Sequence, residues 1–462
     1  MPGRLPDTVD TPDVEAWLRQ ILRGDLRRSD KEFVRGGNTF AEIYAMSQGL
    51  RELFSAPACR EEVVCLAAEN KAVIAAAVLS SLYGGPTLLL PFAFSGRALA
   101  EMREATGFTT AISDRQRDFP AGTRVICPEP GQVRQIHKLP PIDPDAELLK
   151  LFTGGSTGMP RSWSKSAGNL FSEAFYLTRK YQISGKDLIV ATVSPYHIYG
   201  LLFSVIIPLI SSAAVFADTP SFPGEIAAAV IDNSATVLAS VPVHYRVLRG
   251  RQASSGSLRL AFSSAGRLPR VDNEEFCRRN NVPLIEVYGS TETGGIALRV
   301  RSEGEEAYSP FETVDWQESN ENLYVRSAYI APDARRDENG FFAANDRIES
   351  GPDNSFFLRG RSDAVAKVGG KRVNLAEVRD KIKAQRGVED CFVITMPDSG
   401  GRESLIAALI AGEGVDLKEL KKNVMEQLEP YARPRLLKKT ARLPMTAAGK
   451  YDLEVIKRLL AG

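Results

Sequence analysis

Short runs of apolar residues alternate with longer stretches of mixed or apolar character from about residue 62 to residue 300. Short runs rich in β-branched residues predict buried strands, and the longer stretches between them predict helices. Such alternation is typical of βαβ units, whose parallel strands form sheets covered by helices on both faces. We therefore predict an α/β fold with a large N-terminal domain of parallel-rich sheets. Strands are expected at 63–67, 86–90, 148–152, 188–193, 213–216, 236–241, 258–263 and 284–287, and helices at 71–83 and 96–106.

The pattern changes near Asp346, where shorter strand-like runs suggest hairpins. Asn374, followed three residues later by Glu377, resembles a capping box and predicts the start of a helix. We interpret residues 362–462 as a separate, small α+β domain, which leaves 1–361 as the large domain. In this part of the chain, strands are expected at 323–327, 356–358, 391–396 and 404–410, and a second helix at 416–428.

Composition and charge exclude several classes of function. The 462 residues include 58 Lys and Arg against 57 Asp and Glu, a formal net charge of +1, which argues against a nucleic-acid or membrane-surface partner. The longest apolar run, 201–216, contains Pro208 and is too short for a membrane span. Only three histidines are present, which argues against a histidine metal cluster. Five cysteines without CxxC spacing, and no signal-peptide pattern in residues 1–30, favour a cytoplasmic enzyme with reduced thiols.

A segment dense in glycines and hydroxyls follows the strand expected at 148–152. Its glycines allow the backbone to approach a polyanion, and its N–H and hydroxyl groups can donate hydrogen bonds to phosphate oxygens. The segment lacks the GxxxxGK(S/T) pattern of a Walker loop. Because 162–166 suggests a second strand, the segment is expected to be a loop between strands that either binds phosphate or forms a polar turn. It comprises Thr153, Gly154, Gly155, Ser156, Thr157 and Gly158.

A second candidate follows the strand expected at 284–287. Its Tyr288 ring can stack on a base, and its Glu292 carboxylate can hold a hard cation such as Mg²⁺ through oxygen. Taken alone, the stretch is better explained as a turn with a capping Glu. The candidate residues are Tyr288, Gly289, Ser290, Thr291 and Glu292.

Two charged stretches lie further along the chain. In the first, Asp346 can accept hydrogen bonds from both ribose hydroxyls, and Arg361 can contact ribose or phosphate with its planar guanidinium. In the second, Lys450 follows a glycine on a loop that can carry it into a remote site, where it would neutralise developing charge. Each has a simpler interpretation when taken alone, as a surface ion-pair cluster and as a solvated lysine.

Together, the four stretches resemble the motifs of the adenylate-forming superfamily, which comprises acyl-CoA synthetases, aryl-acid adenylating enzymes and luciferases. The motifs there read roughly (S/T)SG(S/T)TGxPK, YGxTE, TGD with GRxDxxIKxxG, and PxTxxGK. The resemblance runs from about residue 62 to Lys450, close to the whole chain. Four separate motifs in the same order make it specific.

The resemblance implies a nucleotide site that takes ATP and Mg²⁺. The loop 153–158 with Arg161 would hold the β- and γ-phosphates, and Glu292 would bind Mg²⁺. Asp346 would hold the ribose hydroxyls with help from Arg361. The residues expected against the adenine and the α-phosphate are Ala265, Gly266, Arg267, Tyr288, Gly289, Ser290 and Thr291.

The resemblance also implies that the small C-terminal domain is mobile. Asp363 would be its hinge, and Gly369 and Gly370 would line the tunnel for a pantetheine thiol. Lys450 would enter the site for the adenylation step and leave it for the thiol step. The catalytic residues implied are Lys450, Glu292 and Thr157.

Three departures from the family motifs are visible. Arg161 replaces the usual Lys, which keeps the charge but changes its geometry. Gly154 replaces a hydroxyl residue and removes one phosphate contact. Asn345 stands where the TGD motif has Gly, although the carboxylate of Asp346 is retained. None of these changes removes a group that the reaction requires.

The pocket for the acid substrate is less well defined by the sequence. The stretch around His197 and Tyr199 resembles the family's aromatic segment beside the acyl group. His197 either gates the thiol tunnel or is a packed core histidine. Val243 and His244 are expected to form another wall of the pocket. Because buried polar groups in a pocket need partners, this lining favours a hydroxybenzoate-type acid.

The sequence leaves several alternatives open. The compact length and the run GGSTGMPRSW are similar to ligases of aryl-polyene pathways, which load an acyl carrier protein. The thiol acceptor is therefore either CoA or a phosphopantetheinyl acyl carrier protein. A medium-chain fatty acyl-CoA ligase is the alternative within the superfamily. A non-catalytic protein that binds ATP or acyl-adenylate would have no use for Lys450 and Glu292, whose presence counts against it.

Overall fold

The chain divides into two compact units. The large unit comprises Met1–Trp316 and Val325–Phe342, and the small unit comprises Gln317–Tyr324 and Ala343–Gly462. The domain boundary predicted after residue 361 falls inside the small unit. That the chain moves as two parts, 1–361 and 362–462, stays a prediction. The computed structural model describes residues 14–23, 29–55, 63–131, 142–153, 161–301, 304, 306–361, 365–368, 371–397, 404–428, 430–446 and 451–462.

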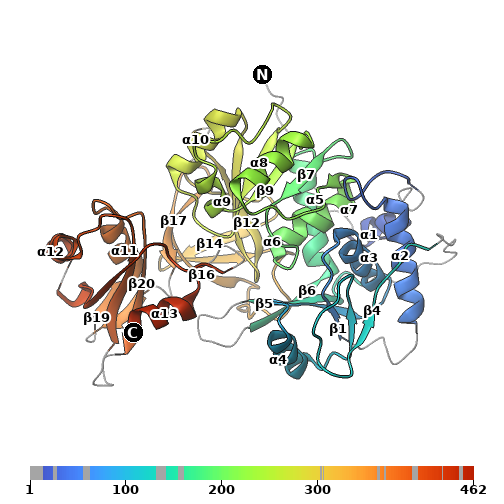
Figure 1. The fold of residues 1–462 in the computed structure, drawn as a ribbon, viewed down its shortest axis with the longest axis horizontal. Coiled ribbons are helices and arrows are strands. Elements are labelled where there is room, and N and C mark those ends of the chain that lie inside the picture. The colour runs from blue at the N-terminus through green and yellow to red at the C-terminus, as the bar shows by residue number, and fades with distance from the viewer. Residues whose placement is uncertain are drawn as a thin grey trace. The chain divides into compact units, whose positions relative to one another are not determined.

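A six-stranded sheet occupies the first part of the large unit, in the order β4-β3-β1-β2-β5-β6. Its strands β1, β4, β5 and β6 are labelled in Figure 1. Its strands are parallel except for the last pair, β5 and β6. Cys65, Leu89 and Ala111 pack against Leu99 and Met102 of a helix that covers one face of this sheet. The strands are β1 (Val63–Leu66), β2 (Thr87–Leu90), β3 (Thr110–Ile112), β4 (Arg124–Ile126), β5 (Glu147–Thr153) and β6 (Arg161–Ser166).

A seven-stranded sheet follows, in the order β13-β12-β11-β10-β9-β7-β8. The strands from β8 to β11 are parallel, whereas β12 and β13 are antiparallel. Val190, Leu238 and Ala261 on neighbouring strands pack with Ile226 and Phe276 of two covering helices. The strands are β7 (Leu188–Ala191), β8 (Ala214–Val215), β9 (Val237–Ser240), β10 (Leu260–Ser263), β11 (Leu284–Ser290), β12 (Gly294–Val300) and β13 (Ser309–Pro310).

The helices of the large unit connect and cover these strands. Every residue of α3 is buried, as expected for an apolar helix between two packed layers. The apolar run at 201–216 forms a π-helical segment followed by α7, and no helix among the described residues is long and apolar enough to cross a membrane. The helices are α1 (Val14–Arg23), α2 (Phe40–Leu53), α3 (Lys71–Leu82), α4 (Gly96–Thr106), α5 (Ala167–Lys180), α6 (Ile198–Leu201), η3 (Leu202–Ile206), α7 (Ile207–Ser211), α8 (Pro223–Asp232), α9 (Pro242–Val247) and α10 (Arg270–Asn280).

The later part of the chain contains short sheets and short helices. A four-stranded sheet, β14-β15-β16-β17, precedes the hairpin β18-β19 and a three-stranded sheet, β20-β21-β22. The strands are β14 (Asp315–Ser319), β15 (Asn322–Arg326), β16 (Phe342–Ser350), β17 (Phe356–Arg361), β18 (Val365–Val368), β19 (Lys371–Asn374), β20 (Asp390–Pro397), β21 (Ser404–Ala411) and β22 (Leu436–Thr440). The helices are α11 (Leu375–Lys383), α12 (Leu417–Gln427), the short η6 (Pro430–Ala432) and α13 (Leu453–Ala461).

The strand β21 is the central strand of the three-stranded sheet in the small unit. Its residues alternate between two faces of the sheet, as the period of a strand requires. Ile406 and Ile410 pack with α11 and α12, whereas Ala407 and Leu409 pack with α13 on the other face. A strand that is apolar at every position after Ser404 is thus buried on both sides.

The predicted α/β class is confirmed, and the predicted strands and helices are present with differences only at their ends. One difference concerns the site. Residues 288–290 continue β11 rather than forming a loop, because Gly289 and Ser290 pair with Gly295 and Gly294 of β12. Asp346 likewise lies within β16. The capping contact between Asn374 and Glu377 stays a prediction.

Asp416 caps the N-terminus of α12, where its carboxylate accepts hydrogen bonds from the backbone N–H groups of Lys418 (2.8 Å) and Glu419 (3.3 Å). Asp416→Ala is therefore expected to lower the free energy of unfolding by about 1 kcal/mol in urea denaturation. Lys421→Ala, an exposed change on the same helix, is the control and should stay within about 0.5 kcal/mol of the wild type. Equal stability of the two variants would contradict the capping role.

Candidate active site

The predicted phosphate loop connects two paired strands. β5 ends at Thr153 and β6 begins at Arg161, and these two residues are partners in an antiparallel ladder. The structure describes only the backbone of Thr153 and Arg161. Gly154, Gly155, Ser156, Thr157 and Gly158 lie outside the described residues, so their phosphate contacts stay predictions. The two flanking strands agree with the expectation of a loop between strands.

Four polar segments meet at one edge of the seven-stranded sheet. They follow the neighbouring strands β7, β9, β10 and β11, whose carboxyl ends share this edge because the strands are parallel. Hydrogen bonds connect the segments: the Thr192 N–H donates to the Ala239 carbonyl at 2.9 Å, and the Ser264 hydroxyl donates to the Val287 carbonyl at 2.8 Å. The predicted adenine residues and one predicted wall of the acid pocket therefore lie at the carboxyl ends of adjacent strands.

The segment after β11 forms a tight hairpin turn. The Ser290 N–H donates to the Thr293 hydroxyl at 3.1 Å, and the Thr293 N–H donates to the Ser290 hydroxyl at 3.2 Å. A Cβ at position 289 would lie 2.2 Å from the Gly294 carbonyl oxygen, so only glycine fits there. The Glu292 side chain is half-exposed at the tip of the turn, and the Tyr288 ring lies 5.7 Å from the Tyr308 ring.

The donor set of this turn fits Mg²⁺. Glu292 offers a carboxylate, and Ser290 and Thr291 offer hydroxyls, all of them hard oxygen ligands. Among the described residues, no cluster of three or more His, Cys, Asp or Glu could form a complete metal site. Mg²⁺ is usually held by one or two carboxylates together with substrate phosphates, so a single glutamate beside a nucleotide is sufficient.

The turn after β10 is open and exposed. Ala265, Gly266 and Arg267 are all solvent-accessible, and Ala265 has a left-handed backbone with φ of 65°. A Cβ at position 266 would meet only the ring of Pro242, at 3.6 Å. Pro242 is the first residue of α9, which carries Val243 and His244. The predicted adenine segment therefore lies beside the helix predicted to line the acid pocket.

His244 is half-buried and contacts two buried hydroxyl groups, which together form the His244 cluster. Its Nδ1 lies 2.8 Å from the Thr192 hydroxyl and 3.5 Å from the Ser240 hydroxyl, and these two hydroxyls are 2.7 Å apart. Burial lowers the pKa of His244, so the imidazole is neutral at neutral pH. Thr192 and Ser240 were not predicted as site residues. Their signal in the sequence is that each is a polar residue at the carboxyl end of an apolar strand.

The aromatic segment after β7 contributes Tyr199 and His197. Tyr199 is buried in α6, with its ring 5.2 Å from the Phe203 ring. Burial raises the pKa of the Tyr199 phenol, and a nearby backbone group of Ser240 partly offsets this rise. His197 is half-buried at the start of α6, where its N–H donates to the Ser194 carbonyl at 3.0 Å. Tyr199 thus lies near the His244 cluster.

In the small unit, two predicted ribose ligands are brought together. Asp346 on β16 and Arg361 on β17 are backbone partners in the antiparallel ladder of these two consecutive strands. Asp346 is half-exposed, and the structure describes only the backbone of Arg361. Lys450, Asp363, Gly369 and Gly370 lie outside the described residues. An isolated bridge between Met445 and Tyr451 joins the chain on the two sides of the predicted catalytic lysine.

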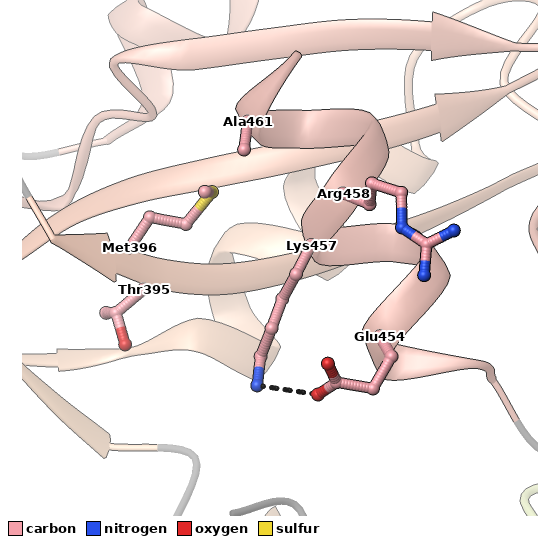
Figure 2. Close-up of a pocket in the computed structure, with 6 residues that line it drawn as sticks. All are labelled: Thr395, Met396, Glu454, Lys457, Arg458 and Ala461. Atoms are coloured by element: carbon pink, nitrogen blue, oxygen red, sulfur yellow. Dashed lines mark hydrogen bonds and ion pairs between the residues drawn. The ribbon is translucent and has the colours of Figure 1, made fainter. Parts of the chain in front are cut away.

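Two open hollows lie on the small unit, and neither includes a predicted site residue. The first, of about 330 Å³, lies between β20 and α13 (Figure 2). Figure 2 shows Lys457 turned toward Glu454, with which it forms an ion pair at 3.4 Å, and Arg458 extending away from it. The second, of about 530 Å³, is lined by lysines of α12 and by Arg433. Both hollows are bordered by a mixture of charged and apolar side chains.

The fold and this sheet edge define an α/β nucleotide-binding enzyme with a small C-terminal α+β unit. The chain belongs to the AMP-binding enzyme family: the family model matches residues 27–329, and the model of the AMP-binding enzyme C-terminal domain matches residues 377–450. ATP and Mg²⁺ are the cofactors found with this family.

Curated relatives are acid–CoA ligases at low identity. A sulfoacetate–CoA ligase of Cupriavidus necator is 24% identical over 68% of this chain and 67% of its own length. An acetyl-coenzyme A synthetase of Pseudoalteromonas translucida is 23% identical over 68% of this chain and 56% of its own length. A feruloyl-CoA synthase of an Amycolatopsis species is 24% identical over 76% of this chain and 73% of its own length. The match thus spans only about half of some of these relatives.

Solved structures share the fold over nearly the whole chain. ATP-bound MatB from Rhodopseudomonas palustris has a TM-score of 0.79 at 18% identity, covering 96% of this chain and 98% of that one. The o-succinylbenzoate CoA synthetase of Bacillus subtilis, in complex with ATP and magnesium ion, has a TM-score of 0.78 at 18% identity and covers 96% and 99%. The anthranilate CoA ligase AuaEII, in complex with anthranoyl-AMP, has a TM-score of 0.75 at 17% identity and covers 96% of each chain.

The lowered pKa of His244 has a measurable consequence for stability. Since the folded pKa lies below that of an unfolded histidine, about 6.5, protonation opposes folding, and stability falls as the pH decreases from about 6.5 through the folded pKa. In protein labelled on its three histidines, the NMR signal that disappears in His244→Gln should titrate below about 6.5. Titration of that signal at or above 6.5 would contradict the partly desolvated environment of His244.

Proposed function

We propose that this chain is an ATP-dependent acid–thiol ligase that converts a carboxylate to an acyl-adenylate and then to a thioester. The observation that carries the proposal is the shared sheet edge, where the Glu292 turn (residues 290–295), the Ala265–Arg267 turn and the His244 cluster lie at the ends of adjacent strands. An edge of this kind can hold a nucleotide and an acid next to each other. Membership of the AMP-binding enzyme family supports the same proposal.

In the first half-reaction, an oxygen of the carboxylate attacks the α-phosphorus of ATP in line, and the bond to pyrophosphate breaks. The carboxylate is already a competent nucleophile, so the protein contributes positioning and charge neutralisation. The loop 153–158 and Arg161 would hold the β- and γ-phosphates, and Asp346 with Arg361 would hold the ribose. Glu292 would hold Mg²⁺, which supplies neutralisation of the phosphate charge.

In the second half-reaction, a thiol attacks the acyl carbon, a thioester forms and AMP leaves. We propose that the domains 1–361 and 362–462 rotate about Asp363 between the two steps, which withdraws Lys450 and brings Gly369 and Gly370 to the thiol tunnel. A mixed anhydride is easily hydrolysed, so a closed site that excludes water is needed in both steps.

The proposed acid is a hydroxybenzoate-type aryl acid. The neutral His244 imidazole, held by the Thr192 and Ser240 hydroxyls, offers a polar group beside a pocket whose other walls would be Val243, Tyr199 and His197. The likeness to a feruloyl-CoA synthase and to an anthranilate CoA ligase supports an aryl acid. A medium-chain fatty acid is the alternative substrate class.

The proposed thiol is the pantetheine of CoA or of an acyl carrier protein. The curated relatives named above are CoA ligases, which supports CoA, whereas the aryl-polyene resemblance supports a carrier protein. The cytoplasm is the proposed compartment, since ATP and reduced thiols are both available there. A non-catalytic protein that binds ATP or acyl-adenylate is the remaining alternative.

Lys450→Ala tests the proposed reaction. Loss of one charge-neutralising group should lower carboxylate-dependent pyrophosphate release by about 10²–10³ with Mg²⁺ and ATP. The same variant should still form thioester from supplied acyl-adenylate, because the lysine is withdrawn in that step. Lys457→Ala, which removes an exposed lysine paired with Glu454 in the same unit, is the control. Unchanged pyrophosphate release in Lys450→Ala would refute the assignment.

A screen of acids by pyrophosphate exchange tests the proposed substrate. Hydroxybenzoates should react better than benzoate, and both better than medium-chain fatty acids. His244→Leu should reduce the preference for hydroxybenzoate over benzoate about tenfold, the equivalent of one hydrogen bond, without changing the KM for ATP. CoA and a carrier protein are then offered as acceptors to the best acid. A reaction with aliphatic acids only would refute the aryl-acid proposal.

A further inference from the structure

A buried pair of opposite charges in the large unit takes no part in the reaction described above. Lys165 on β6 is 1% exposed, and Glu173 on α5 is 6% exposed. Charged side chains are rarely buried to this extent without partners that compensate for the lost water. Burial lowers the pKa of Lys165 and raises that of Glu173, and their mutual attraction opposes both shifts.

The ammonium group of Lys165 is bonded to the backbone of the Glu292 turn, residues 290–295. Its Nζ donates to the Tyr329 carbonyl at 2.8 Å and to the Glu292 carbonyl at 3.3 Å. The Glu292 carbonyl also accepts from the Ala331 N–H at 2.7 Å. Lys165 belongs to the strand that follows the phosphate loop, in the six-stranded sheet, whereas the Glu292 turn belongs to the seven-stranded sheet. The lysine therefore ties the two sheets at the candidate site.

The carboxylate of Glu173 holds the other end of the turn. Its Oε1 accepts a hydrogen bond from the Gly295 N–H at 2.9 Å. A Cβ at position 294 would lie 2.6 Å from Glu173 Oε2, and one at position 295 would lie 3.0 Å from Oε1. The backbone of Gly294 and Gly295 thus packs directly on the carboxylate, with no room for a side chain.

The segment that supplies the Tyr329 carbonyl is itself held in place by hydrogen bonds. The Asn169 side chain donates to the Ala328 carbonyl at 2.6 Å and to the Ile330 carbonyl at 3.2 Å. The Ser164 N–H, next to Lys165, donates to the Asp333 carboxylate at 3.2 Å. Because β6, α5 and residues 328–333 are joined in this way, the acceptors of Lys165 cannot shift independently of the phosphate-loop strand.

We propose that Lys165 and Glu173 are positioning residues that fix the Glu292 turn relative to β6, the strand that follows the predicted phosphate loop. The inference rests on the proposed function, because it assigns the Glu292 carboxylate to Mg²⁺ beside the triphosphate. Neither residue touches the substrate. Each acts through the backbone on either side of the Glu292 side chain, as residues outside the ligand shell orient metal ligands in other proteins.

The test is a double variant, Lys165→Met with Glu173→Gln. It removes both charges at similar volume, so no unpaired charge is left buried. The matched control is Lys71→Met. Lys71 is also 1% exposed, and its Nζ donates to two backbone carbonyls, those of Phe216 (2.7 Å) and Asp218 (2.8 Å), in another part of the same unit. Glu173→Gln alone is a milder second variant.

The main readout is ATP binding by calorimetry with and without Mg²⁺, together with thermal unfolding. Mg²⁺ raises the affinity of the wild type for ATP by a certain factor, and in the double variant this factor should be about tenfold smaller. In pyrophosphate exchange it should need about tenfold more free Mg²⁺ for half-maximal rate, with the KM for the acid unchanged. Lys71→Met should keep both Mg²⁺ responses even if it unfolds at a lower temperature.

A folded double variant with the wild-type Mg²⁺ response would overturn the proposal. If the double variant does not fold, Glu173→Gln decides: a Mg²⁺ response reduced about threefold supports positioning, and an unchanged one overturns it. Failure of the proposed function is a different result, namely no carboxylate-dependent exchange by the wild type with any acid. The binding measurement still tests the role of Lys165 and Glu173 in that case.

Discussion

A buried ammonium group must find hydrogen-bond acceptors without water, and this requirement constrains the part of the candidate site around the Glu292 turn. The acceptors of Lys165 are the backbone carbonyls of Tyr329 and Glu292. A backbone carbonyl cannot move without its segment, so the lysine holds together pieces of chain that are 127 positions apart in sequence. Glu173 compensates the charge and holds Gly295. The strand after the phosphate loop and the turn that carries Glu292 are thereby kept in one arrangement.

The second constraint is the direction of the strands. Parallel strands bring all their carboxyl ends to one edge, and polar residues that would be costly in the core can be accommodated there. Thr192, Ser240 and Ser264 lie at this edge and bond to one another's segments. The parallel arrangement that buries apolar side chains within the sheets therefore also places, at one edge, the groups that could recognise an acid and a nucleotide.

Much of the fold could be predicted because its strands are short apolar runs with clear ends. The errors occur where pairing overrides local pattern. Tyr288 to Ser290 look like a loop in the sequence but extend β11, since β12 returns alongside them. Lys165 and Glu173 were missed as site residues. The spacing of apolar residues around them indicates that both are buried. Lys165 follows buried Trp163 by two positions on β6, and Glu173 lies on the buried face of α5 with Leu170 and Leu177.

The sequence by itself determined the α/β class, the order of the elements and the residue types able to bind phosphate, ribose and a hard cation, because these depend on local pattern and on chemistry. It could not say which of those residues meet. That His244 is bonded to Thr192 and that a buried lysine holds the Glu292 turn were decided by tertiary structure alone. Each is a contact between segments distant in the chain, and such contacts arise only when sheets and helices pack together to bury their apolar faces.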